Sequence, residues 1–349
     1  MDRAMCDVEV LIPTFQRAEL LRRAIKSVRA QTYSTLSICV YDNASTDETQ
    51  VVVAQLALED PRIKYFRHDE NVGAIGNFNF ALSKVTATYF AFLSDDDVLF
   101  PDCILDAVSS LNTHADIAYW GGNTLQVDDS TGRVRRGAGW LYTSGKVVYS
   151  PFEACARICG GNHMEFQGLV FRTAMVRESG VRFNGDVGLA DVDFELALAS
   201  RYSVGMSSNV SAAMSVHAGS ASSGARPFAL YWPAMEIIGK RLISSTALSA
   251  DQKRRCANEW EKTVIFLLVN YAPLWVKNHK AMEYSTIARI LREHYPDNFI
   301  SVVCRKILGL YSLPSPTPFL AWLLLKLIHF FVRPMAYVSR LLPMTKRSP

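Results

Sequence analysis

Cysteine is scarce in this sequence, and the cysteines do not form a disulfide framework. The 349 residues include seven of them, an odd number scattered along the chain. Secreted domains that depend on disulfides carry dense, paired cysteines instead. The first seven residues, MDRAMCD, also lack an apolar signal region. We therefore expect a reducing, cytoplasmic environment.

Stretches in which basic residues alternate with aromatic residues are absent as well. The formal net charge is only +4. A nucleic-acid groove needs clustered positive charge, so we do not expect a nucleic-acid partner. Hydrophobic residues make up 49% of the chain, and no repeat or low-complexity tract occurs. These features exclude a disordered or collagen-like chain and favour a globular enzyme.

The last 49 residues, 301–349, contain no aspartate or glutamate. Their basic residues are Arg305, Lys306, Lys326, Arg333, Arg340, Lys346 and Arg347. Between them lies the stretch PFLAWLLLKLIHFFVRPMAYVSRLL. Its apolar run is interrupted by Lys326 and His329 and ends at Pro334. A membrane span needs about 20 consecutive apolar residues, which are not available here.

An interfacial helix fits this tail better than a membrane span. Basic groups beside buried Trp, Phe and Leu side chains bind an anionic inner leaflet, at about 1 kcal/mol for each charge near the surface. We expect peripheral association with the cytoplasmic face of the membrane. The alternative is that these helices pack on the rest of the protein.

Short apolar runs alternate with helical patterns from Val8 to about Trp120. This rhythm predicts an α/β fold with a mostly parallel sheet covered by helices. Residues 121–225 are richer in Gly, Ser and Asn and predict loops and added strands, and the chain from Pro227 onward is mostly helical in pattern. We expect three regions, 1–125, 126–225 and 226–349.

Polar residues follow three of the predicted strands. Thr14 follows the first, the Asp42–Asn43 pair the second, and Asp95, Asp96 and Asp97 the fourth. Ligands of open α/β sheets bind at the carboxyl ends of the strands. We expect these side chains to be neighbours in space.

Three adjacent aspartates at the edge of a core repel one another unless something compensates their charge. Oxygen-rich sites of this kind suit Mg²⁺ or Mn²⁺, held partly by substrate phosphates. The sequence therefore predicts a divalent metal at Asp95, Asp96 and Asp97. The alternative is that the triplet only caps the helix that begins near Pro101.

Four segments together carry a family resemblance: VEVLIPTFQR, VYDNASTDET, NVGAIGNFN and FLSDDDVLFP. In this order and spacing they resemble the nucleotide-binding half of the family 2 glycosyltransferases, which have the GT-A fold. The resemblance covers about the first 125 residues. It implies an inverting transfer of a sugar from a nucleotide-sugar, with a divalent ion at the Asp-x-Asp motif.

The resemblance also implies which residues bind the donor. The ribose and the metal are held in similar enzymes by the residues that match Asp95, Asp96 and Asp97. Many members have an aspartate where this chain has Ser94, so the two aspartates that touch the metal stay open. The donor-binding residues that we expect are Pro13, Thr14, Phe15, Asp42, Asn43, Asn71, Asn77, Asp95 and Asp96.

Inverting transfer also needs a general base that deprotonates the acceptor hydroxyl. The segment GLADVDFELAL resembles the acceptor half of the family, and the matching base is Asp191, although Ala190 replaces the usual glutamate. In a helix over 191–200, Asp191 and Glu195 share one face and Asp193 points elsewhere. Asp191 could also serve only as a helix cap.

His217, in MSVHAGSASSG, precedes a run of Gly and Ser. Similar enzymes often carry a histidine here that contacts the diphosphate or the metal, so we assign His217 to the metal site. The family's arginine two positions earlier is here Ser215. A structural role is the alternative for a single histidine.

The expected function is hexosyl transfer from a nucleotide-sugar, most often a UDP-sugar, to a glycan or polyprenyl-linked acceptor in surface polysaccharide biosynthesis. Two alternatives are a sugar-phosphate nucleotidyltransferase and a non-catalytic nucleotide-sugar-binding protein. The first needs a Gly-rich phosphate loop after the first strand, whereas IPTFQR contains no glycine. A binding protein would keep its UDP-sugar affinity and show no other effect in Asp191→Ala. In a transferase, the same substitution should abolish sugar transfer.

Overall fold

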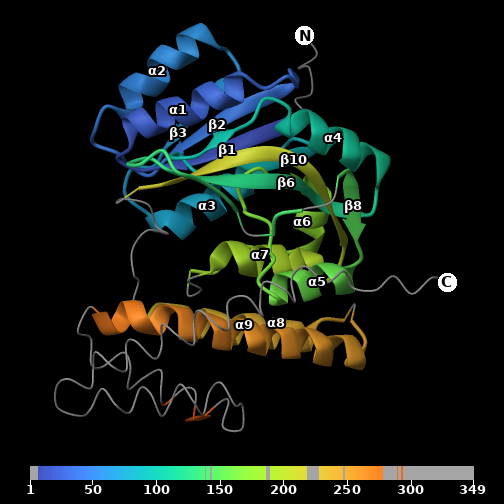
Figure 1. Ribbon diagram of the computed structural model, residues 1–349. Helices are drawn as coiled ribbons and strands as arrows, with labels where there is room; N and C mark the ends of the chain where they lie inside the picture. Colours follow the sequence, from blue (N-terminus) through green and yellow to red (C-terminus); the bar gives the residue numbers. More distant parts are fainter. Residues whose placement is uncertain are drawn as a thin grey trace.

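A computed structural model describes residues 7–137, 139–141, 144–185, 189–217, 228–246, 248–277, 289 and 292–293. In this part of the chain, one ten-stranded sheet lies between helices on both of its faces (Figure 1). The fold is α/β, as the sequence predicts. The tail 301–349, for which we predict membrane association, lies outside the described residues.

The first half of the sheet is parallel. Its order is β3-β2-β1-β4, and both neighbours of β1 run parallel to it, with Leu11 opposite Cys39 on one side and Phe92 on the other. All residues of β1, β2 and β4 are buried, as expected for central parallel strands. The bounds are β1 (Val8–Thr14), β2 (Leu36–Asp42), β3 (Ile63–Arg67) and β4 (Tyr89–Phe92).

The second half of the sheet contains antiparallel strands. β9 is antiparallel to both β4 and β6, so it joins the two halves, and β10 runs parallel to β6. The predicted boundary at residue 125 falls within β6. The bounds are β5 (Val98–Leu99), β6 (Ile117–Asp128), β7 (Val134–Arg136), β8 (Lys146–Tyr149), β9 (Val170–Arg172) and β10 (Ser203–Val216).

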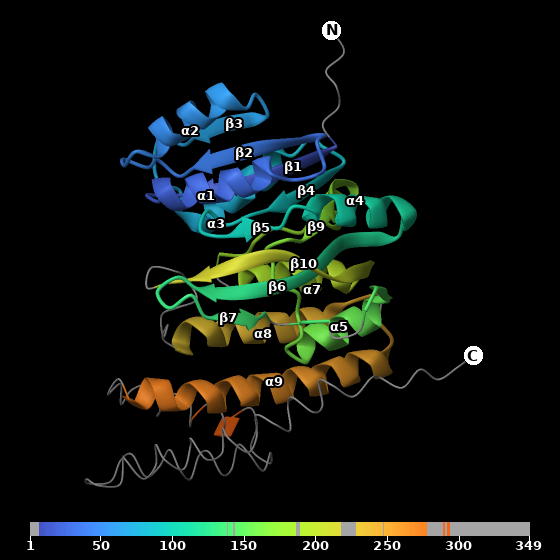
Figure 2. The same ribbon diagram turned by 45° about the horizontal axis from the view of Figure 1, so that its top comes forward.

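Helices cover the sheet in layers (Figures 1 and 2). One face is covered by α1 (Ala18–Arg29), α2 (Thr49–Glu59) and α4 (Cys103–Thr113). The other face is covered by α3 (Gly73–Lys84), α5 (Pro151–Cys159), α6 (Thr173–Ser179) and α7 (Ala190–Ala199). The helices α8 (Phe228–Ser244) and α9 (Ala250–Lys277) form a further layer beneath α5 and α7.

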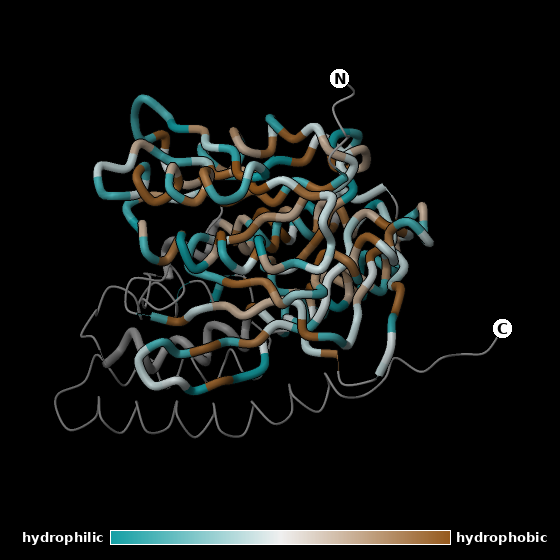
Figure 3. The backbone as a smooth tube through the Cα atoms, turned by 90° about the horizontal axis from the view of Figure 1, so that it is seen from above, coloured by the Kyte–Doolittle hydropathy of each residue, from teal (hydrophilic) through white to brown (hydrophobic). Residues whose placement is uncertain are grey.

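Two hydrophobic cores result, one on each face of the sheet. Hydrophobic stretches run through the middle of the molecule and hydrophilic ones lie mainly in the connecting loops (Figure 3). The core under α7 is rich in aromatic rings, and Phe183 stacks on Phe194 with ring centroids 4.5 Å apart. Such pairs add about 0.5–1.5 kcal/mol beyond the area that they bury.

Local sequence signals fix several helix ends. Ser150 and Glu153 form a capping box at the start of α5, and Pro151 occupies the first turn, where its missing N–H costs nothing. Gly180 follows α6 with φ of 66°, the left-handed conformation that glycine adopts without strain. These signals set the start of α5 and the end of α6. Within the described ranges, no helix is long and apolar enough to cross a membrane.

Candidate functional site

The ends of β1 and β4 meet in a direct side-chain contact. The hydroxyl of Thr14, the last residue of β1, donates a 2.7 Å hydrogen bond to Asp95 Oδ2. Asn43, which follows β2, donates its backbone N–H to the carbonyl of Thr14 at 3.0 Å. The expectation that these strand ends are neighbours is confirmed.

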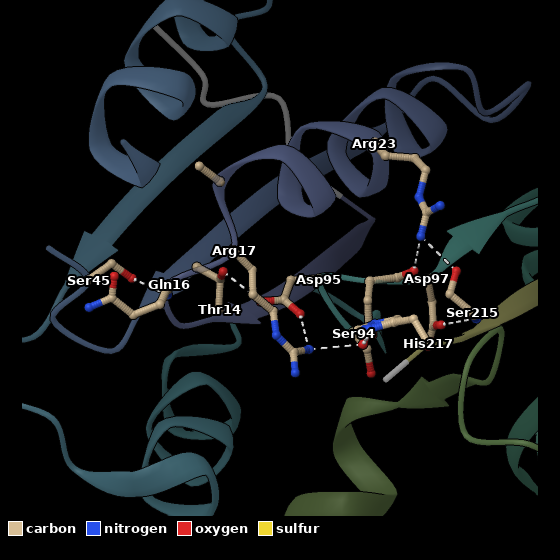
Figure 4. Close-up of polar contacts among 12 residues, drawn as sticks. Thr14, Gln16, Arg17, Arg23, Ser45, Ser94, Asp95, Asp97, Ser215 and His217 are labelled. Carbon is tan, nitrogen blue, oxygen red and sulfur yellow. Dashed lines mark hydrogen bonds and ion pairs between the residues drawn. The ribbon is translucent and has the colours of Figure 1, made fainter. Parts of the chain in front are cut away.

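Arg17 connects two of the three aspartates (Figure 4). Its Nη1 lies 3.1 Å from Asp95 Oδ1 and 2.9 Å from Asp96 Oδ2. Asp96 Oδ2 is also 3.1 Å from His217 Nε2, so the histidine that follows β10 belongs to the same cluster. The sequence reasoning did not single out Arg17, although it lies only three residues beyond Thr14.

A second arginine ties β10 to the aspartate loop. Arg23 on α1 donates through Nη2 to the backbone carbonyl of Asp96 and to the hydroxyl of Ser215, the latter at 2.7 Å. Ser215 in turn donates its backbone N–H to Asp97 Oδ1 at 2.8 Å. Ser215, which stands in place of the family's arginine, thus holds the Asp95–Asp97 loop. Arg23 on α1 supplies the positive charge.

Burial raises the pKa of two of the three aspartates. Asp97 is 1% exposed, and burial, followed by repulsion from Asp96, raises its pKa to about 8. Burial also raises the pKa of Asp95, although Thr14 and Arg17 oppose the rise. A cation bound beside this cluster would favour the charged forms.

The donor set suits a hard divalent cation. Carboxylate oxygens are ligands that Mn²⁺ and Mg²⁺ prefer, and these ions complete their shell with water and phosphate oxygens. No three His, Cys, Asp or Glu side chains of the described residues are arranged to hold a metal by themselves. Asp96 and His217, which approach within 3.1 Å, are the pair best placed to hold one together with a bound phosphate.

The polar side chains after β2 hold the neighbouring loops. Asp42 is fully buried and accepts the backbone N–H of Ser45 at 2.9 Å and the hydroxyl of Tyr65 at 2.5 Å. Asn43 accepts the backbone N–H of Val72 and donates to Asn71, both at 2.8 Å. Asp42 and Asn43 therefore fix the loops that follow β2 and β3.

The remaining predicted donor residues lie on or beside β1 and β2. Asn77 is 2% exposed and donates to the Tyr41 carbonyl at 2.8 Å. Pro13 is buried within β1, opposite Tyr41, whereas the Phe15 ring is 41% exposed beyond the strand end. An exposed aromatic ring at this edge offers a surface on which a planar base can stack.

Two residues without glycine's freedom adopt positive φ beside the site. Gln16 has φ of 58° and Ala44 of 62°, one in each of the loops after β1 and β2. The loops are joined because Gln16 N–H donates to the Ser45 hydroxyl at 2.9 Å. Backbone strain of this kind costs about 1–3 kcal/mol and concentrates at functional sites.

The helix that carries the predicted base is present as α7. Asp191 is exposed in its first turn, with Oδ1 accepting the N–H of Val192 at 2.9 Å. Asp193 is fully buried and turns away to Arg241 on α8, as the helical spacing predicts. No hydrogen bond or ion pair joins Asp191 to the Asp95–Asp97 cluster within the described part of the chain.

Glu195 lies one turn beyond Asp191 and is fully buried. Neither of its carboxyl oxygens has a hydrogen-bond partner among the described residues. Burial, then the charges of Asp191 and Glu165, raise its pKa well above the ordinary value. Burial therefore favours the uncharged form of this carboxyl group.

Solved structures of nucleotide-sugar enzymes share this fold. Residues 1–349 of TarS from S. aureus, in complex with UDP-GlcNAc, superpose with a TM-score of 0.64 over 93% of this chain and 91% of that chain, at 15% identity. The mannosyltransferase PcManGT from Pyrobaculum calidifontis, in complex with GDP-Man and Mn²⁺, gives a TM-score of 0.51 over 93% and 87%, also at 15% identity. At this identity the likeness shows the fold alone, which is GT-A-like.

The sequence comparisons find a family model and relatives that are similar to part of the chain. Residues 9–164 match "Glycosyl transferase family 2". A GalNAc(5)-diNAcBac-PP-undecaprenol beta-1,3-glucosyltransferase from Campylobacter jejuni is 39% identical over 116 residues, which are 33% of this chain and 36% of that relative. The chain thus aligns with about a third of this relative's length. Residues 9–164 of this chain are thus similar to glycosyl transferase family 2.

Proposed function

We propose that this protein transfers a hexose, with inversion, from a nucleoside diphosphate sugar to a hydroxyl group of a glycan or polyprenyl-linked acceptor. The observation that supports this most is the cluster of Thr14, Arg17, Asp95, Asp96 and His217 at the ends of β1, β4 and β10. Cations and acids alternate there at hydrogen-bonding distance. A diphosphate with a divalent cation fits such a place.

The donor half of the site would work by charge compensation. Arg17 and His217 are positioned to receive the diphosphate, while the exposed ring of Phe15 supports the base. Asp96 and His217, with Asp95 and Asp97 beside them, would hold Mn²⁺ or Mg²⁺, and the ion would supply positive charge that favours departure of the nucleoside diphosphate. Hydrogen bonds hold the loops beside β2 in place, so little reorganisation would accompany donor binding. They are made by Asp42, Asn43, Asn71 and Asn77.

Asp191 is the proposed general base. Its carboxylate is exposed at the start of α7, where an acceptor can approach from solvent. The carboxylate takes the proton of the acceptor hydroxyl as the oxygen attacks the anomeric carbon. The bond to the diphosphate oxygen breaks on the opposite face, which inverts the configuration.

Similar proteins suggest the classes of donor and acceptor. TarS is solved with UDP-GlcNAc and PcManGT with GDP-Man and Mn²⁺, while the Campylobacter relative acts on an undecaprenol-linked glycan. We propose UDP-sugar as the donor and a role in surface polysaccharide biosynthesis. The basic, acid-free tail 301–349 would hold the protein at the cytoplasmic face of the membrane.

Paired binding and turnover measurements test the proposal. UDP affinity with and without Mn²⁺ is measured by calorimetry, and product formation from a UDP-sugar and a polyprenyl diphosphate-linked glycan by chromatography. Asp95→Asn should lower UDP affinity, whereas Asp191→Ala should preserve affinity and reduce turnover at least 100-fold, about 2.7 kcal/mol. Asp116→Ala, an exposed site before β6, is the matched control and should change neither.

Each alternative function has its own outcome. A non-catalytic nucleotide-sugar-binding protein shows UDP-sugar affinity without turnover in any variant, which would contradict the proposal. A sugar-phosphate nucleotidyltransferase releases pyrophosphate from a nucleoside triphosphate and a sugar phosphate. Detection of that release would also overturn it.

A further inference from the structure

A cavity of about 250 Å³ lies between α6, α7 and α8. Arginines reach it from three separate elements: Arg182 after α6, Arg201 after α7 and Arg241 on α8. It is lined by none of the cluster residues that we call the donor edge, which are Thr14, Arg17, Asp95, Asp96 and His217. It lies at the end of α7 opposite Asp191, and Ser200 follows Asp191 by nine positions, a rise of about 13 Å.

Positive charge in this cavity exceeds negative charge. Arg241 is paired with the buried carboxylate of Asp193, at 2.7 Å. Arg182 and Arg201 are exposed and have no ion-pair partner among the residues that the structure describes. Glu178, the nearest acid on α6, interacts with Tyr202 and does not line the cavity.

Helix carboxyl ends normally repel anions, but here serine hydroxyls satisfy their last carbonyls. Ser179 donates to the carbonyl of Val176 at 2.7 Å, and Ser200 donates to that of Ala197 at 3.0 Å. Ser244 donates to the carbonyl of Arg241 at 3.0 Å. The negative ends of α6, α7 and α8 are thus partly neutralised toward the cavity.

A second hollow continues this surface on the other side of Arg182. It has a volume of about 180 Å³ and includes Arg177 and Thr173, whose buried hydroxyl has no hydrogen-bond partner in the described part of the chain. Arg182 lines both hollows. The two hollows together are lined by four arginines.

We propose that these two hollows bind a phosphate group, with Arg182 and Arg201 as its principal ligands. Guanidinium groups recognise phosphate oxygens through paired, charge-assisted hydrogen bonds. The occupant bridges the sheet-bound helices α6 and α7 to α8 in the outer layer. This site is independent of the proposed transfer reaction, because none of its residues lies at the donor edge.

Calorimetry with inorganic phosphate on the full chain tests the site. The double variant Arg182→Ala/Arg201→Ala should bind phosphate at least tenfold more weakly than the wild type, a loss of about 1.4 kcal/mol. Arg254→Ala removes an exposed arginine of α9 and should leave the affinity unchanged. Arg17→Ala distinguishes the two sites. If phosphate binds at the donor edge, this variant and not the double variant should lose the affinity.

Two further arms identify the source of the phosphate. Glycerol 3-phosphate represents soluble phosphate esters, and vesicles of phosphatidylcholine with phosphatidic acid represent lipid headgroups, with pure phosphatidylcholine vesicles as reference. A difference between the wild type and the double variant in either arm supports the site and assigns its ligand. Equal phosphate affinity of both proteins overturns it, and Arg182→Gln/Arg201→Gln, which removes the charge and keeps most of the side-chain length, replaces the double variant if that protein does not fold.

Discussion

Arg241 on α8 forms two hydrogen bonds with the buried carboxylate of Asp193 on α7, at 2.7 and 2.8 Å. Asp193 is fully buried, whereas the Arg241 side chain is 34% exposed. The pair therefore attaches the outer helix layer to the helix that carries the proposed base. Bidentate geometry of this kind is specific for arginine.

Replacing Arg241 should destabilise the protein. Arg241→Ala leaves a buried charge without its partner, which costs about 3–5 kcal/mol for fully buried pairs. Because Arg241 is partly exposed, we expect the lower end of that range in urea unfolding. Arg254→Ala breaks only an exposed pair with Asp251 and should cost less than about 1 kcal/mol. The same substitution is also made in an Asp193→Asn background. If Arg241→Ala lowers the free energy of unfolding equally in both backgrounds, the two residues are not coupled.

Glu195→Gln should stabilise the protein increasingly as the pH rises. The folded-state pKa of Glu195 is raised, so between its unfolded and folded pKa values the folded state binds more protons, and stability falls with rising pH. Glutamine keeps the shape of the side chain and cannot ionise. Melting temperatures of the two proteins should therefore agree near pH 4 and separate by pH 8. A constant difference across that range would show that Glu195 does not titrate with folding.

Thr14→Val should destabilise the free protein. It removes a 2.7 Å hydrogen bond to Asp95 while both residues stay buried. Hydrogen bonds to charged groups contribute about 1.5–3 kcal/mol. Thr14→Ser keeps the hydroxyl and serves as the control in urea unfolding. Equal stability of the valine and serine variants would contradict a role for the hydroxyl.

Gly205→Ala should also destabilise, for a steric reason. A Cβ at Gly205 on β10 would lie 1.9 Å from the Trp120 ring on β6. Overpacking of a core costs about 1–3 kcal/mol. Gly239→Ala on α8 meets Trp260 at an ordinary 3.7 Å and should stabilise by about 0.5–1 kcal/mol, because glycine is a poor helix former. Thermal unfolding of both variants checks this contrast.

Local patterns in the sequence were sufficient to predict much of the donor edge. Thr14 and Asp95 follow buried apolar strands, and parallel strands bring their ends together. Arg23 was not predictable in this way, because its partner Ser215 lies 192 residues away. The pairing of Asp193 with Arg241 depends on how α8 crosses α7. Such contacts depend on tertiary packing, which no short motif encodes.

The contact between Ser215 and Asp97 spans 118 residues. β10, which supplies Ser215, pairs with β6 and β5 at the far side of the sheet from β3. A nascent chain therefore cannot complete this edge until the ribosome has released residue 217. Contacts of such long range form late in folding. A chain that stops before β10 therefore lacks both the Ser215 N–H that Asp97 accepts and the His217 ring that contacts Asp96, so its donor site is incomplete.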